Sequence, residues 1–281
     1  MNTAASLERK AERLREILAS HAGLIVAYSG GVDSAFLAWV AHEVLGSQMR
    51  AVIADSASLA RTHLEDALIF AREHKIPVEV VETQELENPA YRRNDAMRCF
   101  HCKDELFTVL DRYREVGGFN AIAYGVNADD EGDFRPGQQA ARQHHVLTPL
   151  LEAGLNKTEI RELARQAELR VWDKPASACL SSRLEYGLAV TPEALSVIER
   201  GEDALRAMGF RQFRVRHHGE IVRIEIAPEE LPSALSPEMA RQFTAVFKGL
   251  GFKFVTLDLE GFRSGSMNQL LTAEELLRGR G

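Results

Sequence analysis

The first part of the chain alternates short apolar runs with longer segments in which apolar residues recur at helical spacing. The short runs predict buried strands, and the periodic segments predict amphipathic helices. Strands are expected at residues 24–28, 51–54, 78–81 and 121–124, with a short last one at 146–147. Helices are expected at residues 6–19, 34–45, 59–74 and 100–116, in a segment ending at 142, and from 156 to about 167, where Asn156 with Glu159 three positions later can cap the helix. This alternation predicts an α/β fold with a doubly wound, mostly parallel sheet.

The pattern changes after Gly187. Strands are expected at residues 188–190, 213–217, 221–226 and 253–257, and helices at 191–208 and 239–250. The second and third of these strands flank a short turn and predict a hairpin. We therefore expect a large domain over residues 1–187 and a smaller α+β domain over residues 188–281, of ferredoxin-like type.

The composition is that of an ordinary globular protein. The 281 residues are 45% hydrophobic and 27% charged, which allows one large domain or two domains. A net charge of −7 argues against an extended nucleic-acid interface. The chain has no apolar run long enough for a membrane span, and residues 6–21 lack the apolar region of a signal peptide. These features predict a cytoplasmic protein that does not act at a membrane.

The most informative motif follows the first expected strand and reads Ser29-Gly30-Gly31-Val32-Asp33-Ser34. Its glycines let the backbone turn tightly, so that amide groups and the start of the next helix can bind an anion. Ser29 and Ser34 offer hydroxyl groups to phosphate oxygens, and Asp33 can orient a metal ion or cap the helix. A plain strand-to-helix turn is the alternative interpretation.

This motif lacks the lysine of the common phosphate-binding loops and resembles the loop of the ATP pyrophosphatase superfamily. The resemblance implies an adenine nucleotide alpha hydrolase-like fold that splits ATP between the α- and β-phosphates. Ala54, at the end of the second expected strand, is a candidate for holding the adenine or ribose. Gly125 follows the strand at 121–124, and Asp129 with Asp130 comes soon after it. These carboxylates are candidates for binding Mg²⁺ together with pyrophosphate, although a solvated turn explains paired aspartates equally well.

The chain has three cysteines, Cys99, Cys102 and Cys179, and an odd number argues against a disulfide framework. Cys99 and Cys102 are three positions apart at an expected helix start, where both sulfurs can reach one metal. Three uses remain open at this point. The thiols can be unmetallated, they can form a zinc site with His101 or His217, or they can hold an iron–sulfur cluster through three thiolates.

Several segments occur together in an order that resembles the LarE family of pyridinium-3,5-biscarboxylic acid mononucleotide sulfurtransferases. Besides the phosphate loop, they are Arg98 to Lys103, Gly132 to Gly137, Lys174 to Arg183, Phe213 to Gly219 and Leu257 to Asn268. The resemblance runs from about Leu24 to Asn268, and the segment around Cys179 is its most specific part. It implies that ATP adenylates a substrate carboxylate, pyrophosphate leaves, sulfur attacks the acyl-adenylate and AMP leaves. Two rounds give the dithio nucleotide that later binds nickel.

Members of this family differ in their source of sulfur. Those with only the cysteine that matches Cys179 sacrifice its sulfur and retain dehydroalanine. Those with three cysteines resemble members in which a [4Fe-4S] cluster carries a sulfur that can be recharged. Since this chain has all three, the resemblance favours Cys99, Cys102 and Cys179 as cluster ligands, with sulfide or a sulfur-donor protein as a partner.

The resemblance also assigns roles to charged residues near the C-terminus. Arg214 and Arg216 alternate with apolar residues on an expected strand, so they share one face and suit the phosphate of the substrate. A solvated sheet face is the alternative. Arg183 is a candidate catalytic residue that balances charge on the adenylate or the mononucleotide. Glu202 is a candidate for binding metal or substrate, although an exposed helical glutamate is the default expectation.

Three other functions are alternatives to a LarE-type sulfurtransferase. A tRNA thiolase of the same superfamily also uses three cysteines and a cluster, but the acidic composition and the lack of an RNA-binding appendage count against it. An amidotransferase-type synthetase would need a glutaminase region. A non-catalytic nucleotide- or metal-sensing module with structural zinc is a third possibility. The family resemblance also implies a homo-oligomer with ATP, Mg²⁺ and the cluster as cofactors.

Overall fold

The computed structural model describes residues 3–131, 136–175, 178–263, 265–272 and 274 of the chain. Within these residues it divides into two compact units, one formed by Met1–Glu85 and Cys99–Ser177 and the other by Leu86–Arg98 and Ala178–Gly279. The expected domain division after residue 187 remains a prediction, since the units change over at residues 177 and 178. Parts of three sequence motifs, at residues 132–135, 176–177 and 264, lie outside the described residues.

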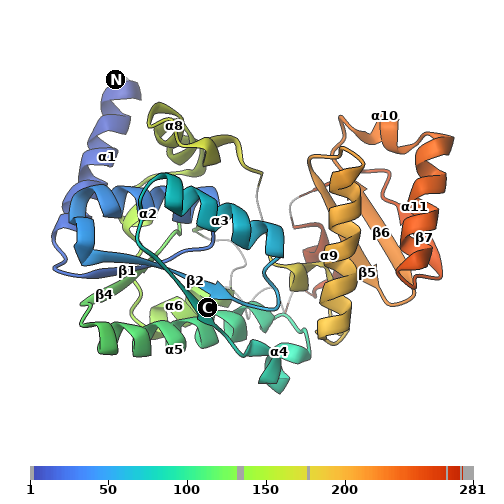
Figure 1. The fold of residues 1–281 in the computed structure, drawn as a ribbon, viewed down its shortest axis with the longest axis horizontal. Coiled ribbons are helices and arrows are strands. Elements are labelled where there is room, and N and C mark those ends of the chain that lie inside the picture. The colour runs from blue at the N-terminus through green and yellow to red at the C-terminus, as the bar shows by residue number, and fades with distance from the viewer. Residues whose placement is uncertain (1–2, 132–135, 176–177, 264, 273, 275–281) are drawn as a thin grey trace. The chain divides into compact units, whose positions relative to one another are not determined.

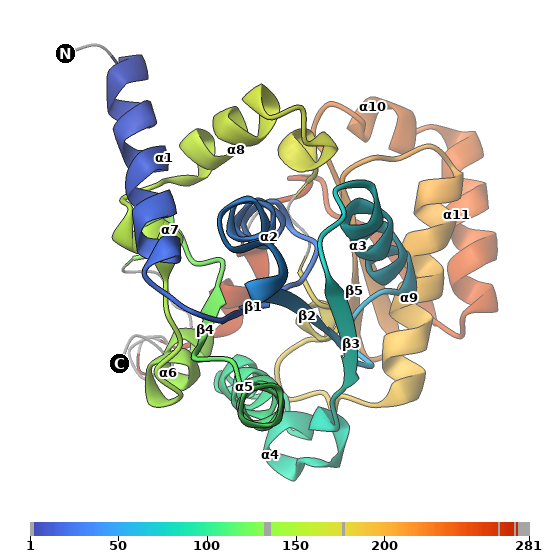
Figure 2. The same ribbon diagram turned by 60° about the vertical axis from the view of Figure 1, so that its left-hand side comes forward.

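The first unit is built on a parallel sheet of four strands (Figures 1 and 2). The strands are β1 (Leu24–Ala27), β2 (Met49–Asp55), β3 (Val78–Glu82) and β4 (Ala121–Tyr124), in the order β3-β2-β1-β4. Each pairing is parallel, as predicted from the alternation of strands and helices. The strand expected at residues 146–147 is reduced to a single bridge between Ala123 and Leu147.

Helices cover both faces of this sheet (Figure 2). One face carries α1 (Thr3–Ala19), α2 (Val32–Leu45), α3 (Arg61–Glu73), α7 (Pro149–Glu152) and α8 (Lys157–Gln166). The other face carries α5 (Arg98–Gly117) and α6 (Pro136–Gln143). Successive strand residues point to opposite faces, so Val26 joins the first core and Ile25 the second. The doubly wound α/β architecture is therefore confirmed.

The start of α8 is fixed by the cap predicted from the sequence. The side chain of Asn156 accepts a hydrogen bond from the amide of Glu159 at 2.8 Å. The Glu159 carboxylate in turn accepts one from the amide of Asn156 at 3.0 Å. This reciprocal pair satisfies two amide groups of the helix start and sets the position of Lys157, the first residue of α8.

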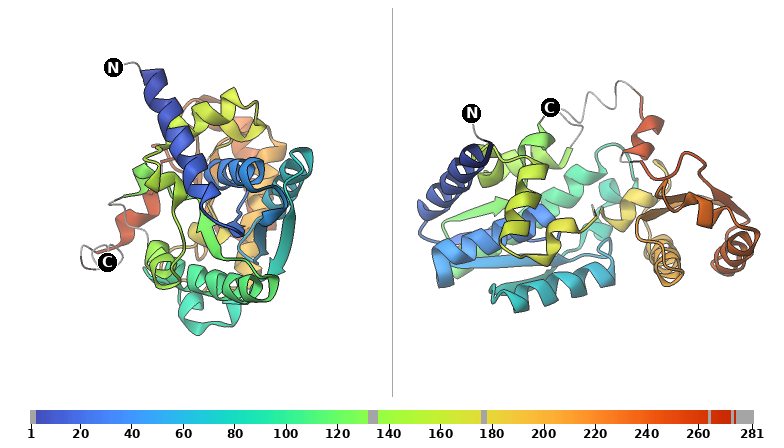
Figure 3. Two further views of the ribbon diagram at one scale, coloured as in Figure 1. Left: turned by 90° about the vertical axis from the view of Figure 1, so that its left-hand side faces the viewer. Right: turned by 90° about the horizontal axis from the view of Figure 1, so that it is seen from above.

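The second unit holds a sheet of three strands, β5 (Phe213–His218), β6 (Ile221–Ile226) and β7 (Phe254–Leu257) (Figure 3). Strands β5 and β6 form the predicted antiparallel hairpin, whereas β7 runs parallel to β6. Helices α9 (Pro192–Ala207) and α11 (Pro237–Gly249) pack on the sheet, and the short helices are α4 (Pro89–Arg92) and α10 (Leu231–Ala234). The described helices of the chain include none with the length and apolar character that a membrane crossing needs.

Two expectations for this unit are wrong. Residues 188–190 form no strand, because the amide of Val190 donates to the carbonyl of Arg92 at 2.9 Å rather than to a sheet strand. Without an opening strand, the sheet described here has three strands and is not ferredoxin-like. Val190 is instead bonded to the end of α4, a partner that the apolar pattern of residues 188–190 does not distinguish from a strand.

A histidine between two carboxylates lies on the α5 side of the first unit. The Nδ1 atom of His144 is 2.7 Å from Asp111, and its Nε2 atom is 3.1 Å from Asp104. Partial burial lowers the pKa of His144, but the hydrogen bonds and charges of Asp111 and Asp104 outweigh it, and the pKa is raised overall. The doubly protonated ring can donate to both carboxylates, so this is the form that the fold stabilises.

The raised pKa of His144 predicts a pH-dependent stability. Its contribution to the free energy of unfolding should be complete below about pH 6.5, the unfolded value, and should fall as the pH rises through the folded pKa. Urea unfolding of the wild type and of His144→Asn, from acid to mildly alkaline pH, measures this difference. His21→Asn is the control, since His21 pairs with no carboxylate among the described residues. A His144→Asn curve that stays parallel to the wild type would contradict the prediction.

Candidate functional site

The phosphate loop lies at the carboxyl end of β1 and leads directly into α2, with Gly31 at the N-cap. The first amide groups of a helix lack intrahelical partners and carry the positive end of the helix dipole. Gly30 has φ 70°, and a Cβ atom there would lie 2.5 Å from Cβ of Ala67 on α3. Only glycine fits this position, so the loop keeps its amide groups exposed to a bound anion.

The two predicted serine hydroxyls of the loop are close together. The Oγ atoms of Ser29 and Ser34 are 3.0 Å apart, and Ser34 Oγ also accepts a hydrogen bond from the Ser29 amide at 3.1 Å. Ser34 Oγ donates to the carbonyl of Gly31. These bonds hold the hydroxyls on the loop, where both can turn to phosphate oxygens.

The other predicted nucleotide-binding positions lie at the same edge of the sheet. Gly125 follows β4, which pairs with β1, and a Cβ atom on Gly125 would be 2.8 Å from the amide nitrogen of Ser34. Ala54 is the penultimate residue of β2. In open parallel sheets, ligands bind beyond the carboxyl ends of the strands, where connections leave to opposite sides. The edge formed by β2, β1 and β4 has this arrangement.

A lysine far away in the sequence supplies the cation that the loop itself lacks. Nζ of Lys157, on α8, is 2.5 Å from Oδ2 of Asp33. Burial raises the pKa of Asp33 and Asp130 adds to this effect, while Lys157 lowers it, leaving the pKa above its usual value. Oδ1 of Asp33 is buried without a hydrogen-bond partner among the described residues. An orphaned carboxylate oxygen beside a phosphate loop fits a Mg²⁺ ligand.

The expected magnesium ligands Asp129 and Asp130 already order the backbone. Asp129 accepts a hydrogen bond from the amide of Lys157 at 2.9 Å, so it helps to cap α8. Asp130 accepts one from the amide of Asn127 at 3.1 Å. Each carboxylate thus has an oxygen engaged with the main chain, and the role of Asp129 in nucleotide binding remains a prediction.

The three cysteines divide between the two units. Cys99 and Cys102 lie on the first turn of α5 in the first unit, Cys179 lies in the second, and none forms a disulfide. Within the described part of the chain, no three His, Cys, Asp or Glu side chains are gathered so that they could hold a metal ion. The donor set of three thiols still has the chemistry that a cluster needs.

Cys179 lies in a strongly positive environment inside the second unit. Its Sγ atom is 3.1 Å from the Oγ atom of Ser181, and the guanidinium groups of Arg98 and Arg183 act on it. Burial alone would raise the pKa of Cys179, but Arg98, Ser181 and Arg183 together hold it below its ordinary value. The thiolate is the form that acts as nucleophile or metal ligand, so this environment favours sulfur chemistry.

Arg183 is fully buried and anchors the loop that carries Cys179. It donates to the carbonyls of Ala178 at 2.7 Å and Cys179 at 3.0 Å. Its other donors contact Glu202 at 2.9 and 3.3 Å. Glu202 is only 5% exposed, which overturns the default expectation of a solvated helical glutamate. Burial would raise the pKa of Glu202, but Arg183 and Arg214 keep it lowered, so the pair is ionised.

Replacing Glu202 by alanine should strongly destabilise the protein. The change leaves the Arg183 guanidinium buried without its counter-ion, which costs about 3–5 kcal/mol in other proteins. Asp203→Ala on the same helix is the control, because the Asp203–Arg206 pair is exposed and should contribute less than about 1 kcal/mol. Urea unfolding measures the free energy of unfolding of both variants. Equal decreases would show that the buried pair stabilises the protein no more than the exposed pair does.

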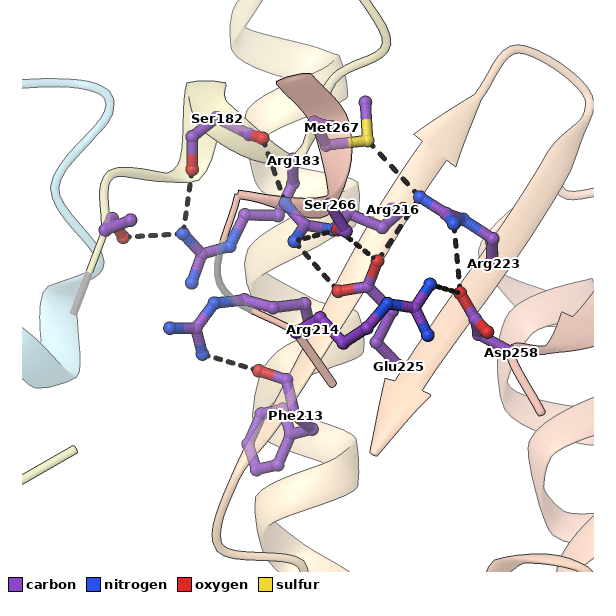
Figure 4. Close-up of polar contacts among 12 residues, drawn as sticks. Ser182, Arg183, Phe213, Arg214, Arg216, Arg223, Glu225, Asp258, Ser266 and Met267 are labelled. Carbon is purple, nitrogen blue, oxygen red and sulfur yellow. Dashed lines mark hydrogen bonds and ion pairs between the residues drawn. The ribbon is translucent and has the colours of Figure 1, made fainter. Parts of the chain in front are cut away.

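Arg214 and Arg216 share one face of the second sheet, as predicted (Figure 4). Arg216 contacts Glu225 at 2.8 Å, Ser266 at 3.1 Å and the carbonyl of Ser182 at 3.1 Å. Arg214 lies 4.8 Å from the ring centroid of Phe262. Burial, with the charges of Arg183 and Arg216, lowers its pKa to about 10, so it stays charged at neutral pH.

The fully buried Glu225, which the sequence pattern did not single out, neutralises part of this positive face. It also contacts Arg223 at 3.2 Å, and Arg223 reaches Asp258 at 3.0 Å. Figure 4 shows Glu225 between the guanidinium groups of Arg216 and Arg223. A phosphate arriving at this face would compete with Glu225 for Arg216.

Comparisons with known proteins cover different lengths of the chain. Residues 7–101 match a family model described as NAD synthase. The chain is 42% identical to the protein slr1717 of Synechocystis sp., over 95% of this chain and 99% of that protein. It is 33% identical to pyridinium-3,5-bisthiocarboxylic acid mononucleotide synthase of Lactiplantibacillus plantarum, over 97% of this chain and 98% of that protein. It is also 27% identical to a glutamine-hydrolyzing GMP synthase of Trichormus variabilis, over 59% of this chain and 35% of that protein.

Proposed function

Because this chain belongs to the LarE family of ATP pyrophosphatases, we propose that it is an ATP-dependent sulfurtransferase acting on pyridinium-3,5-biscarboxylic acid mononucleotide. The observation that carries the proposal is similarity to the Lactiplantibacillus plantarum synthase that continues through both units. The product is the thiocarboxylate precursor of the nickel-pincer nucleotide cofactor. A tRNA substrate finds no specific support in the described residues.

The first step activates a carboxylate of the substrate. A carboxylate oxygen attacks the α-phosphorus of ATP, the bond to the bridging oxygen of the β-phosphate breaks, and pyrophosphate leaves with the electron pair. The amide groups at the start of α2 and the cation of Lys157 stabilise the charge that develops on pyrophosphate. Mg²⁺, held by Asp33, would neutralise further charge on the same oxygens.

The second step transfers sulfur to the activated carbonyl carbon. Sulfur attacks this carbon, the bond to the AMP oxygen breaks, and AMP leaves with the electron pair. A [4Fe-4S] cluster bound through Cys99, Cys102 and Cys179 would supply an exchangeable sulfide. Arg98 supports this ligand set, because it directly precedes Cys99 in the chain and lies in the same unit as Cys179.

A single-use mechanism is the alternative that uses the same thiol. Sγ of Cys179 attacks the acyl carbon and forms a thioester as AMP leaves. Loss of the Cα proton then breaks the Cβ–S bond, which leaves a thiocarboxylate on the substrate and dehydroalanine in the protein. In both mechanisms Arg98 and Arg183 favour the thiolate of Cys179.

Arg214 and Arg216 are proposed to bind the phosphate of the mononucleotide. Their shared face and the charge of Arg214 at neutral pH support this assignment. A guanidinium fork matches phosphate oxygens in two-point contacts. This geometry leaves Arg183, whose donors are occupied by protein acceptors, to hold the Cys179 loop.

Anaerobic purification followed by iron and sulfide analysis tests the proposed sulfur source. A brown protein with about four irons and at least four sulfides per chain is expected. Incubation with ATP and the mononucleotide should release AMP and pyrophosphate and form the thiocarboxylate. A colourless protein that loses the mass of one sulfur on turnover would replace the cluster by sacrificial Cys179. A protein that forms no thiocarboxylate would refute the proposed function.

A further inference from the structure

Asn94 is a fully buried polar residue that makes three hydrogen bonds to one loop. Its side-chain amide donates to the carbonyls of Glu185 at 2.8 Å and Leu188 at 2.9 Å. Its main-chain carbonyl accepts a hydrogen bond from the amide of Gly187 at 3.0 Å. Its side-chain oxygen accepts one from Arg98 at 2.5 Å. Asn94 therefore joins the segment before α5 to the loop that follows Cys179.

Arg98 extends the same attachment toward Cys179. Its guanidinium donates to the carbonyl of Ser181 at 2.9 Å and lies 5.6 Å from the ring centroid of Tyr186. Arg98 is only 4% exposed. Arg183 holds the carbonyls of Ala178 and Cys179, so one arginine fixes the loop at Cys179 and the other fixes it at Ser181.

These contacts have features of a functional arrangement. Burying an amide and a guanidinium is unfavourable unless their hydrogen bonds are satisfied, as they are for Asn94. Asn94 has φ 55°, a left-handed conformation that tertiary contacts must maintain. Neither residue belongs to the unit that contains the phosphate loop. Asn94 and Arg98 instead order the loop that carries Cys179.

We propose that Asn94 and Arg98 form a clasp that positions Cys179 for sulfur transfer. The inference rests on the proposed function and adds two positioning residues to it. The clasp acts through the loop backbone and does not touch the reacting carbonyl carbon. Because Cys99 is the next residue after Arg98, the clasp also anchors the point at which the chain enters the Cys-x-x-Cys helix turn.

Asn94→Gly is the sharpest variant for a test. Glycine adopts φ 55° without strain, so the change removes the side-chain bonds and leaves the backbone conformation accessible. Lys75→Gly is the matched control, because exposed Lys75 also has φ 55° but lies in the first unit. Both changes add a glycine to the unfolded chain, and only one removes the clasp. Arg98→Lys keeps the positive charge and loses the planar fork.

Two measurements decide between positioning and general stabilisation. In metal-free protein, hydrogen exchange at the amides of Gly187 and Val190 should be at least about tenfold faster in Asn94→Gly than in Lys75→Gly. In single turnovers, sulfur transfer should be about 10- to 100-fold slower, because small misplacements of a reacting group have effects of this size. Pyrophosphate exchange into ATP, which reports activation alone, should match the control. Arg98→Lys should transfer sulfur at only part of the wild-type rate.

The other outcomes overturn the inference. Unchanged exchange at Gly187 and Val190 would show that the clasp does not hold the loop. Faster exchange with normal sulfur transfer would show that holding the loop does not position Cys179. Equal losses of activation and sulfur transfer would indicate general destabilisation. Failure of the wild type itself to transfer sulfur would refute the proposed function, and this is distinguishable because no variant is involved.

Discussion

Changing Cys179 to alanine is expected to abolish sulfur transfer while leaving activation by ATP intact. Cys179 is the thiol that both proposed mechanisms require, either as a cluster ligand or as the sulfur that is given up. Removing a group that forms a covalent bond in the reaction lowers rates by at least roughly 1,000-fold in well-studied enzymes. The phosphate loop belongs to the other unit, and none of its residues is changed in this variant. Thiocarboxylate formation and pyrophosphate exchange into ATP measure the two steps separately.

Cys99→Ala and Cys102→Ala distinguish the two sources of sulfur. If a cluster carries the sulfur, each change should remove bound iron and reduce sulfur transfer as severely as Cys179→Ala does. If Cys179 is sacrificed, both variants should still complete one turnover. Sulfur transfer that persists in Cys179→Ala would contradict both mechanisms. Cys179→Ser, which retains a similar volume, controls for a packing defect in the loop.

The fold of the first unit was largely predictable because its signals are local. Buried parallel strands produce continuous apolar runs, and their helices produce a regular apolar periodicity. The cap at Asn156 depends on residues three positions apart and was predicted correctly. The strand expected at residues 188–190 failed because the amide of Val190 bonds to Arg92, about 100 positions earlier, and not to a sheet strand. Composition does not reveal such a partner.

The candidate site shows the same limit. The tight turn at Gly30 and the hydroxyl groups of Ser29 and Ser34 were predictable, because these residues belong to one contiguous motif. Glu225 could have been found, because the two-residue turn of the β5–β6 hairpin sets the register that pairs it with Arg214. Lys157 could not, since it reaches Asp33 across 124 positions of sequence. Long-range ion pairs depend on tertiary packing, which single-sequence patterns do not encode.

Changing Lys157 to methionine is expected to slow activation by ATP about 100- to 1,000-fold, as does removal of a preorganised charge stabiliser in other active sites. The phosphate loop contains no lysine, Lys157 pairs with its Asp33, and the stem length of Lys157 is retained in methionine. Pyrophosphate exchange into ATP measures the effect. Lys10→Met is the matched control, because Lys10 also pairs with the first turn of α8, through Glu159. Lys157→Arg should recover part of the activity.

The same variant should also shift the pH dependence of activation. Burial raises the pKa of Asp33, and Lys157 is the largest influence that lowers it. Without Lys157 the Asp33 pKa should rise further, so the carboxylate needed for Mg²⁺ becomes protonated at a higher pH. The acid limb of the pH–rate profile should therefore move upward in Lys157→Met and stay in place in Lys10→Met. An acid limb that does not move would mean that Asp33 does not act in its ionised form, and the phosphate loop would then use Lys157 only as a cation.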